Sequence, residues 1–343
     1  MITKLQDVAE KAGVSLSATS LILNGKGRFS QEVRYRVHQA AKDLGYKKNI
    51  YASSVARKSF TYMAVLLYED INYISQWAFI RQIFITMDNL LGKKGFFPVI
   101  IPIDFNLTSE KILEKIHSAG CGAVFSFHYT NEELFTNLKD QEIPLVIINN
   151  TDFQNQFHTV STDDFQGAYE GASYLIGLGH ESIAYIDYPR PNMPSIFSDR
   201  FVGFKKALDE KQIDFSKELH ITVDLMNMDD IRSKIAPLVS STARPSALYC
   251  HDDYLAAMIF PILNEFSLSV PEDISVIASG ETLDYDMPFV PKITTMNFDH
   301  EAMGRMSADM MVRIIRGKED SFQSIKVRQH LVDRGSCKIK TDS

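Results

Sequence analysis

The feature that most constrains the fold is an alternation of short apolar runs with longer helical segments from about residue 61 onward. Strands that alternate with helices form parallel sheets, because each parallel connection needs a crossover long enough for a helix. The chain has more strands than a single sheet of this kind usually holds. The pattern therefore predicts two doubly wound α/β lobes with a cleft between them. The apolar runs are Met63–Leu67, Pro98–Ile103, Ala123–Phe127, Leu145–Ile148, Ser182–Ile186, Ser246–Tyr249 and Ser275–Ile277. The helical segments fall near residues 75–94, 109–119, 131–141, 165–179, 199–212, 228–241, 252–267 and 300–316.

The first sixty residues differ from the rest of the chain in charge. They hold eleven Lys and Arg against four Asp and Glu, a net charge of +7, so the remainder must carry −14 to give the total of −7. A basic arm on an acidic body is typical of nucleic-acid binding. The alternative is a solvated charged face that binds nothing.

The same sixty residues carry the start and stop signals of three short helices. Thr3, Ser15 and Ser30 are good N-caps, and Gly13 and Gly45 are placed to end helices. Two short helices across a tight turn, with a third helix behind them, form a helix-turn-helix. The sequence therefore predicts an α-helical helix-turn-helix headpiece, with a purely structural three-helix bundle as the alternative.

The second of these helices, about residues 16–23, is predicted to enter the major groove of DNA with its N-terminal residues against base edges. Hydroxyl groups at helix N-termini hold phosphates, and basic side chains add salt-dependent affinity. The residues predicted to contact the DNA backbone are Thr3, Lys4, Ser15, Arg28, Ser30 and Arg34.

The stretch from Leu5 to Ser15, LQDVAEKAGVS, resembles the opening of the LacI/GalR (lactose-repressor) family of bacterial regulators. The likeness continues through Leu21–Gly25 and Leu44–Tyr46 and is nearly unbroken across the first fifty residues. This resemblance implies a homodimer on palindromic operator DNA, a headpiece over residues 1–48 and a hinge helix over residues 49–60. It also implies a set of DNA-contacting residues, of which Val55 is the apolar wedge that enters the minor groove. The set is Leu16, Ser17, Leu21, Asn24, Asn49, Ala52 and Val55.

Two departures from the family pattern fall on the second helix. Ala18 stands where the family favours threonine, and Leu21 stands where it often has arginine. Leucine cannot hydrogen-bond a base edge, so Leu16 and Leu21 are restricted to apolar contacts. We therefore expect weak direct readout, with DNA shape and minor-groove insertion carrying more of the specificity.

The resemblance extends, with thinner motifs, through the larger part of the chain. It implies a fold like that of periplasmic sugar-binding proteins over residues 61–343. The N-terminal lobe is expected at about 61–160 and 292–322, and the C-terminal lobe at about 161–291 and 323–343. The motifs are Leu178-Gly179-His180, Arg200 with Gly203-Phe204, Val270–Ile277, Thr294-Thr295, Met303-Gly304 and Leu331–Ser336.

The likeness also implies a small sugar-like effector in the cleft, held at the carboxyl ends of the strands. Carboxylates, amides and an arginine flanked by aromatic rings are the groups that a polyol requires. Carried over residue by residue, the effector site consists of Tyr68, Trp77, Phe79, Asn149, Asp163, Arg200, Asp252 and Glu281.

One departure falls inside this predicted effector site. After Ile277 the family pattern has glycine, an aromatic residue and two aspartates, whereas this chain has Ala278, Ser279, Gly280 and Glu281. Gly280 has no side chain to offer at the ligand-binding position. Either Glu281 substitutes for the missing carboxylate, or the effector differs from the usual sugar.

Catalytic and metal-binding signatures are missing from the sequence. It contains no Walker loop, no Gly-x-Ser-x-Gly elbow and no Gly-x-Gly-x-x-Gly after the first strand, so we expect no enzymatic activity and no cofactor. The cluster His251-Asp252-Asp253 is better explained by an aspartate that caps the following helix than by a metal site. Three widely spaced cysteines predict neither a disulfide framework nor a zinc site.

These observations predict a cytoplasmic, sequence-specific DNA-binding regulator: a repressor of carbohydrate-utilisation genes whose operator affinity changes allosterically when the effector binds. No signal segment and no run of about eighteen apolar residues is present, so neither export nor membrane association is expected. Two alternatives stay open. One is a cytosolic ligand-binding or enzymatic α/β protein with a structural basic N-terminus, and the other is a repressor controlled by a protein corepressor.

Overall fold

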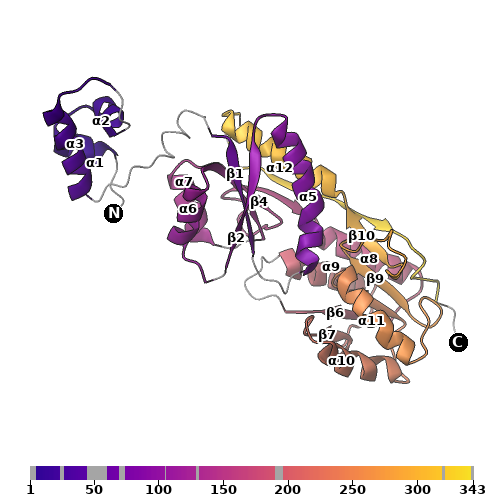
Figure 1. Ribbon diagram of the computed structural model, residues 1–343. Helices are drawn as coiled ribbons and strands as arrows, with labels where there is room; N and C mark the ends of the chain where they lie inside the picture. The colour runs from indigo at the N-terminus through magenta and orange to yellow at the C-terminus, as the bar shows by residue number, and fades with distance from the viewer. Residues whose placement is uncertain are drawn as a thin grey trace. The chain divides into compact units, whose positions relative to one another are not determined.

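The computed structural model describes residues 5–23, 27–44, 60–68, 74–104, 106–128, 131–189, 196–318 and 321–340. The chain divides into two compact units, Met1–Ser59 and Phe60–Ser343 (Figure 1). Within the described ranges, none of the helices combines the length and the apolar character that crossing a membrane requires.

The described part of the first unit consists of α1 (Leu5–Ala12), α2 (Leu16–Leu23) and α3 (Gln31–Asp43). Gly13 follows α1 with a φ of 66°, a left-handed conformation that glycine adopts without steric cost, and the chain turns there into α2. Val8 of α1, Ile22 of α2 and Val37 of α3 meet in one apolar core. This arrangement confirms the predicted helix-turn-helix.

The first sheet of the second unit has the strand order β11-β5-β4-β3-β1-β2, and its strands pair in parallel. Helices α5 and α12 lie side by side over one face (Figure 1), and helices α6 and α7 cover the other. The strands are β1 (Tyr62–Tyr68), β2 (Phe97–Ile103), β3 (Cys121–Phe127), β4 (Leu145–Ile148), β5 (His158–Thr162) and β11 (Ser324–Val327). The helices are α5 (Ile74–Gly92), α6 (Ser109–Ser118), α7 (Glu132–Asp140) and α12 (His300–Ile315).

The second sheet has the order β12-β10-β9-β8-β6-β7, parallel except for β12, which runs antiparallel to β10. Helices α10 and α11 cover one face, and α8 and α9 cover the other. The strands are β6 (Ile183–Asp187), β7 (His220–Thr222), β8 (Ala247–Cys250), β9 (Ser275–Ser279), β10 (Thr294–Phe298) and β12 (Gln329–Val332). The helices are α8 (Asp164–Gly177), α9 (Ile196–Glu210), the 3-10 turn η1 (Lys217–Leu219), α10 (Met228–Ser240) and α11 (Asp253–Glu265). Two doubly wound sheets, as predicted, therefore build this unit.

The chain passes between the two sheets after β5, after β10 and after β11. The predicted lobe boundaries need correction at two of these passages. Residues 294–298 belong to the second lobe, because β10 pairs with β9 and β12. Residues 324–327 belong to the first lobe, because β11 pairs with β5.

Two motif glycines allow helices to approach each other closely. A Cβ atom on Gly203 of α9 would lie 2.1 Å from the carbonyl oxygen of Phe165 in α8. A Cβ atom on Gly304 of α12 would lie 2.7 Å from the carbonyl oxygen of Ile83 in α5. The close contact of these helix pairs therefore depends on glycine at both positions.

Each sheet reverses its strand order once, between β1 and β3 in the first and between β6 and β8 in the second. Successive connections leave such a point over opposite faces, so ligands of doubly wound sheets bind beyond the carboxyl ends of the strands there. These strand ends fix where the candidate effector residues belong.

Candidate functional site

The exposed face of α2 carries the residues predicted to read bases. Leu16 is 49% exposed and Leu21 is 38% exposed, and Ser17 is exposed beside them. On the opposite side of the same helix, Thr19 and Ile22 are buried in the headpiece. The predicted base-reading side chains therefore share one accessible face.

Two serine hydroxyls begin the helices of the headpiece. The backbone N–H of Ala18 donates to Ser15 Oγ at 3.2 Å, and that of Val33 donates to Ser30 Oγ at 3.3 Å. Each serine oxygen accepts one cap bond, which leaves its own O–H able to donate to a phosphate oxygen. These bonds confirm the predicted caps.

The two predicted phosphate-binding arginines differ in their surroundings. Arg28 is exposed, whereas Arg34 is half-buried and donates from Nη2 to the carbonyl oxygen of Gly27 at 2.8 Å. That bond fixes the segment before α3 to the helix itself. Arg34 thus has a structural contact besides its positive charge.

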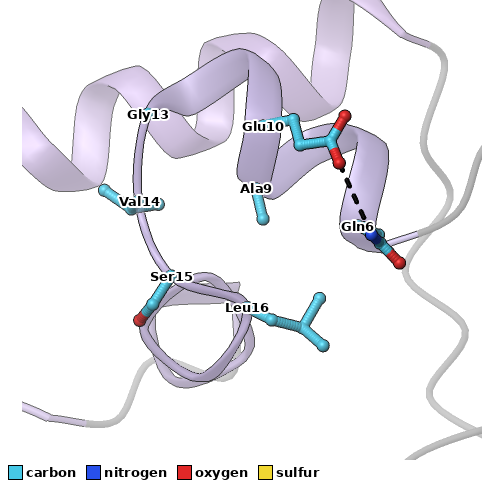
Figure 2. Close-up of a pocket in the computed structure, with 7 residues that line it drawn as sticks. All are labelled: Gln6, Ala9, Glu10, Gly13, Val14, Ser15 and Leu16. Carbon is cyan, nitrogen blue, oxygen red and sulfur yellow. Dashed lines mark hydrogen bonds between the residues drawn. The ribbon is translucent and has the colours of Figure 1, made fainter.

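A shallow recess lies where α1 meets α2 (Figure 2). Figure 2 shows the Leu16 side chain extending from the start of α2 below Ala9 of α1, while Gln6 and Glu10 form a 3.4 Å hydrogen bond at its edge. The lining residues are Gln6, Ala9, Glu10, Gly13, Val14, Ser15 and Leu16. One flank of Leu16 is therefore open.

The remaining predicted DNA contacts lie outside the described residues, as does the predicted hinge helix up to residue 59; they are Thr3, Lys4, Asn24, Asn49, Ala52 and Val55.

Replacing Ser30 by alanine is expected to weaken α3. The variant loses the Oγ that accepts the Val33 N–H, which costs about 1 kcal/mol, or about a fivefold drop in the protection of α3 amides from hydrogen exchange. Ser17→Ala, which removes a hydroxyl from within α2, should leave α3 protection unchanged. Equal protection of α3 in both variants would show that the cap does not stabilise the helix.

In the second unit, two residues at adjacent strand ends form a buried pair. His128 follows β3 and Asn149 follows β4, with φ angles of 54° and 55°. Asn149 Nδ2 lies 2.8 Å from His128 Nε2, and Asn149 Oδ1 lies 2.9 Å from Thr162 Oγ1. Sequence reasoning found Asn149 but missed His128, since nothing in its local pattern marks it.

Asp164 joins residues of both sheets. Its Oδ1 lies 2.7 Å from Thr162 Oγ1 of the first sheet and accepts Gln329 Nε2 of the second at 2.6 Å. Its Oδ2 accepts Arg200 Nε at 2.9 Å, and Arg200 Nη1 donates to the carbonyl oxygen of His251 at 2.8 Å. This buried network crosses from one lobe to the other.

Arg200 is only 6% exposed, so its positive charge needs a partner inside the protein, and the Asp164 carboxylate is that partner. Burial alone would lower the pKa of Arg200, but the negative groups around it, Asp164 foremost and Asp252 after it, together raise the pKa above its ordinary value. The guanidinium therefore stays charged inside the domain. A Cβ atom on Gly280 would lie 3.9 Å from Arg200 Nη2, which places the departure from the family pattern directly beside the arginine.

The aspartates after β8 are held by protein groups. Asp252 Oδ1 accepts the N–H of Leu255 at 2.8 Å, which confirms the predicted cap of α11, and Asp252 Oδ2 accepts the hydroxyl of Tyr188. Asp253 accepts the backbone N–H and the hydroxyl of Thr282. Burial raises the pKa of Asp253 to about 6, although the bonds from Thr282 oppose that rise.

The Glu281 side chain contacts Arg334, a residue near the C-terminal end of the chain. Its Oε2 accepts Arg334 Nη2 at 2.7 Å and Thr295 Oγ1 at 2.9 Å, while the Arg334 guanidinium lies 3.7 Å from the centre of the Tyr285 ring. The carboxylate thus has two protein donors within hydrogen-bonding distance. Glu281 can replace the missing carboxylate of the family pattern only if it leaves these donors.

The other predicted effector residues have separate surroundings. Asp163 is half-buried and its carboxylate lies 3.7 Å from Lys326 Nζ. The Phe79 ring lies 5.2 Å from His128, 5.3 Å from Phe298 and 6.0 Å from His300, measured between ring centres. This buried aromatic cluster adjoins the Asn149 pair through His128.

The backbone of Tyr68 lies in β1 and that of Trp77 in α5, whereas both side chains fall outside the described part of the structure.

Comparison with known proteins gives two family matches. Residues 4–49 match the model of bacterial regulatory proteins of the lacI family, and residues 172–337 match that of the periplasmic binding protein-like domain. The chain is 24% identical to the transcriptional regulator RegA of Clostridium saccharobutylicum, over 98% of this chain and 99% of the relative. It is 27% identical to the transcriptional repressor PurR of Photorhabdus laumondii, over 97% and 96%.

Solved structures show the same fold. A complex of the regulator CelR with cellobiose superposes with a TM-score of 0.69 at 22% identity, over 97% of this chain and 99% of that one. The lac repressor dimer bound to operator and the anti-inducer ONPF gives 0.66 at 21% identity, over 98% and 99%. A LacI-family regulator from Enterococcus faecium with bound ribose gives 0.68 at 23% identity, over 82% and 100%.

Proposed function

Since this chain belongs to the LacI family and is a DNA-binding transcriptional regulator, we propose that it is a repressor whose operator affinity is set by a small effector. It binds a palindromic operator as a homodimer, and a sugar or sugar derivative at the strand ends of the second unit changes that binding. The observation that carries the proposal is the pairing of a helix-turn-helix unit with two doubly wound sheets joined by a buried polar network.

The headpiece supports the DNA-binding part of this proposal. Leu16, Ser17 and Leu21 share the exposed side of α2, where a recognition helix meets base edges, and Ser15 caps the helix just before them. The net charge of +7 over the first sixty residues supplies the salt-dependent attraction to phosphates. The dimeric state is proposed from the lac repressor, whose solved form is a dimer on its operator.

The strand ends of the second unit support the effector part. Two similar proteins of known structure hold cellobiose and ribose, and this chain offers Arg200, Asp252 and Asn149 near the carboxyl ends of its own strands. Asp164 and Arg200 connect these ends across the two sheets. An effector that contacts groups of both lobes favours one arrangement over another by its difference in affinity, and operator affinity changes with that arrangement.

Selection of DNA by the full-length protein tests both parts. A randomised palindromic duplex library is incubated with the pure protein, with and without a panel of sugars and sugar phosphates, and the bound fraction is sequenced. One palindrome should be enriched, and one compound should change its affinity at least about fivefold, the lower end of ordinary allosteric coupling. Binding that shows only the salt-dependent, sequence-independent background would contradict the proposal.

A further inference from the structure

The recognition helix lacks the side chains that usually read bases. Between Leu16 and Leu23 its sequence is LSATSLIL, with no charged and no amide side chain. Guanine and adenine are most often recognised by Arg, Lys, Asn or Gln, which form paired hydrogen bonds with the base edge. Readout through this helix therefore cannot use those pairs.

Apolar side chains instead flank the exposed face. At about 100° per residue, Leu16, Ser20, Ser17 and Leu21 follow one another around roughly 140° of the helix surface. Leu16 and Leu21 stand at the two margins of this arc, with the serines between them. Neither leucine belongs to the apolar core of the headpiece, which forms around Val8, Ile22 and Val37.

The major groove offers one apolar feature to such side chains. The C5-methyl group of thymine projects into the groove, and no other unmodified base carries a counterpart. We propose that Leu16 and Leu21 read thymine methyl groups, so that each operator half-site carries thymine at the two positions facing these leucines. The inference rests on the proposed operator binding and specifies how the sequence is recognised.

The positions of the two leucines make separate contacts possible. Leu16 is the first residue of α2, at the N-terminal end that approaches base edges, and its flank is open at the recess beside Ala9 (Figure 2). Leu21 lies more than one helical turn further along. A serine hydroxyl can donate to or accept from several bases, so the serines between the leucines discriminate weakly. Specificity through this helix then depends on the methyl groups.

Removing single methyl groups from the DNA tests the proposal. In the operator selected by the full-length protein, each thymine is replaced in turn by deoxyuridine, which deletes the methyl and leaves base pairing and the O4 acceptor intact. Affinity should fall about fourfold at each contacted position of a half-site, the effect of one buried carbon, and should not change at other thymines. Replacing a contacted thymine by 5-methylcytosine should retain more affinity than replacing it by cytosine.

Leucine variants identify which residue reads which methyl. Leu16→Ala should make the operator insensitive to deoxyuridine at one position per half-site, and Leu21→Ala at the other. Both residues are exposed, so these variants should fold as the parent does, which thermal unfolding checks.

The outcomes separate this inference from the proposed function. Specific operator binding that no deoxyuridine substitution weakens would overturn the methyl readout and leave the repressor function standing. An equal loss in the parent and in both leucine variants would also overturn it, because the methyl would then act through DNA shape. If no operator is selected at all, the proposed function fails first and the inference with it.

Discussion

Arg200→Ala should cost about 3–5 kcal/mol of unfolding free energy, because it leaves the buried carboxylate of Asp164 without its cation. The substitution also removes the donor to the His251 carbonyl. Thr162 and Gln329 stay near Asp164, but neither carries a charge that could compensate. Denaturant unfolding of the full chain, followed by a signal from the second unit, measures this loss.

An exposed ion pair on the same helix provides the matched control. Lys205 and Asp209 of α9 form an i,i+4 pair whose side chains are 37% and 55% exposed. Lys205→Ala should cost less than about 1 kcal/mol, because solvent screens an exposed pair. If Arg200→Ala proves no more costly than Lys205→Ala, the Asp164–Arg200 pair does not stabilise the lobe.

Gly203→Ala should destabilise the second lobe by about 3 kcal/mol, the upper part of the usual range for overpacking. The new methyl group would lie 2.1 Å from the carbonyl oxygen of Phe165, a backbone atom that cannot rotate away. Helices α8 and α9 would have to separate, which would loosen the contacts around Phe204. Calorimetry or denaturant unfolding of the full chain would detect the loss.

A glycine on the partner helix α8 serves as the control for this substitution. Gly177 is exposed at the end of the helix, and a Cβ atom there meets no other atom within 4 Å. Gly177→Ala should therefore leave stability unchanged or raise it by up to about 1 kcal/mol, through the better helix propensity of alanine. Similar effects of the two substitutions would refute the steric explanation of the Gly203 motif.

The strands that the sequence predicted share continuous apolar character. In β3 every residue from Cys121 to Phe127 is buried, and a strand covered on both faces needs such a run. Strands β5 and β10 were missed because they are rich in threonine. Their hydroxyls donate to residues outside the strand, Thr159 to Ser324 and Thr295 to Glu281. A hydropathy pattern does not register partners of that kind.

The contacts around the predicted effector residues were not predictable from the sequence. The motif around Arg200 located the arginine, yet its partner Asp164 lies 36 residues earlier. The neighbouring Asp163, which the sequence analysis placed in the effector site, lies near Lys326 instead. Glu281 likewise forms an ion pair with Arg334, which lies 53 residues further along the chain. Such pairings follow from the tertiary fold rather than from any local pattern.

The passages of the chain between the two sheets set an order for folding during synthesis. Helix α12, which covers one face of the first sheet, and β11, which pairs with β5 at its edge, both follow β10 of the second sheet. At about 5–20 residues per second, a ribosome needs roughly 10–30 s to proceed from β5 to β11. For that interval the nascent first lobe has an unpaired edge at β5 and an uncovered apolar surface. The last 44 residues, from His300 onward, thus complete the lobe that was begun first, and a message truncated before α12 would yield a product prone to aggregate.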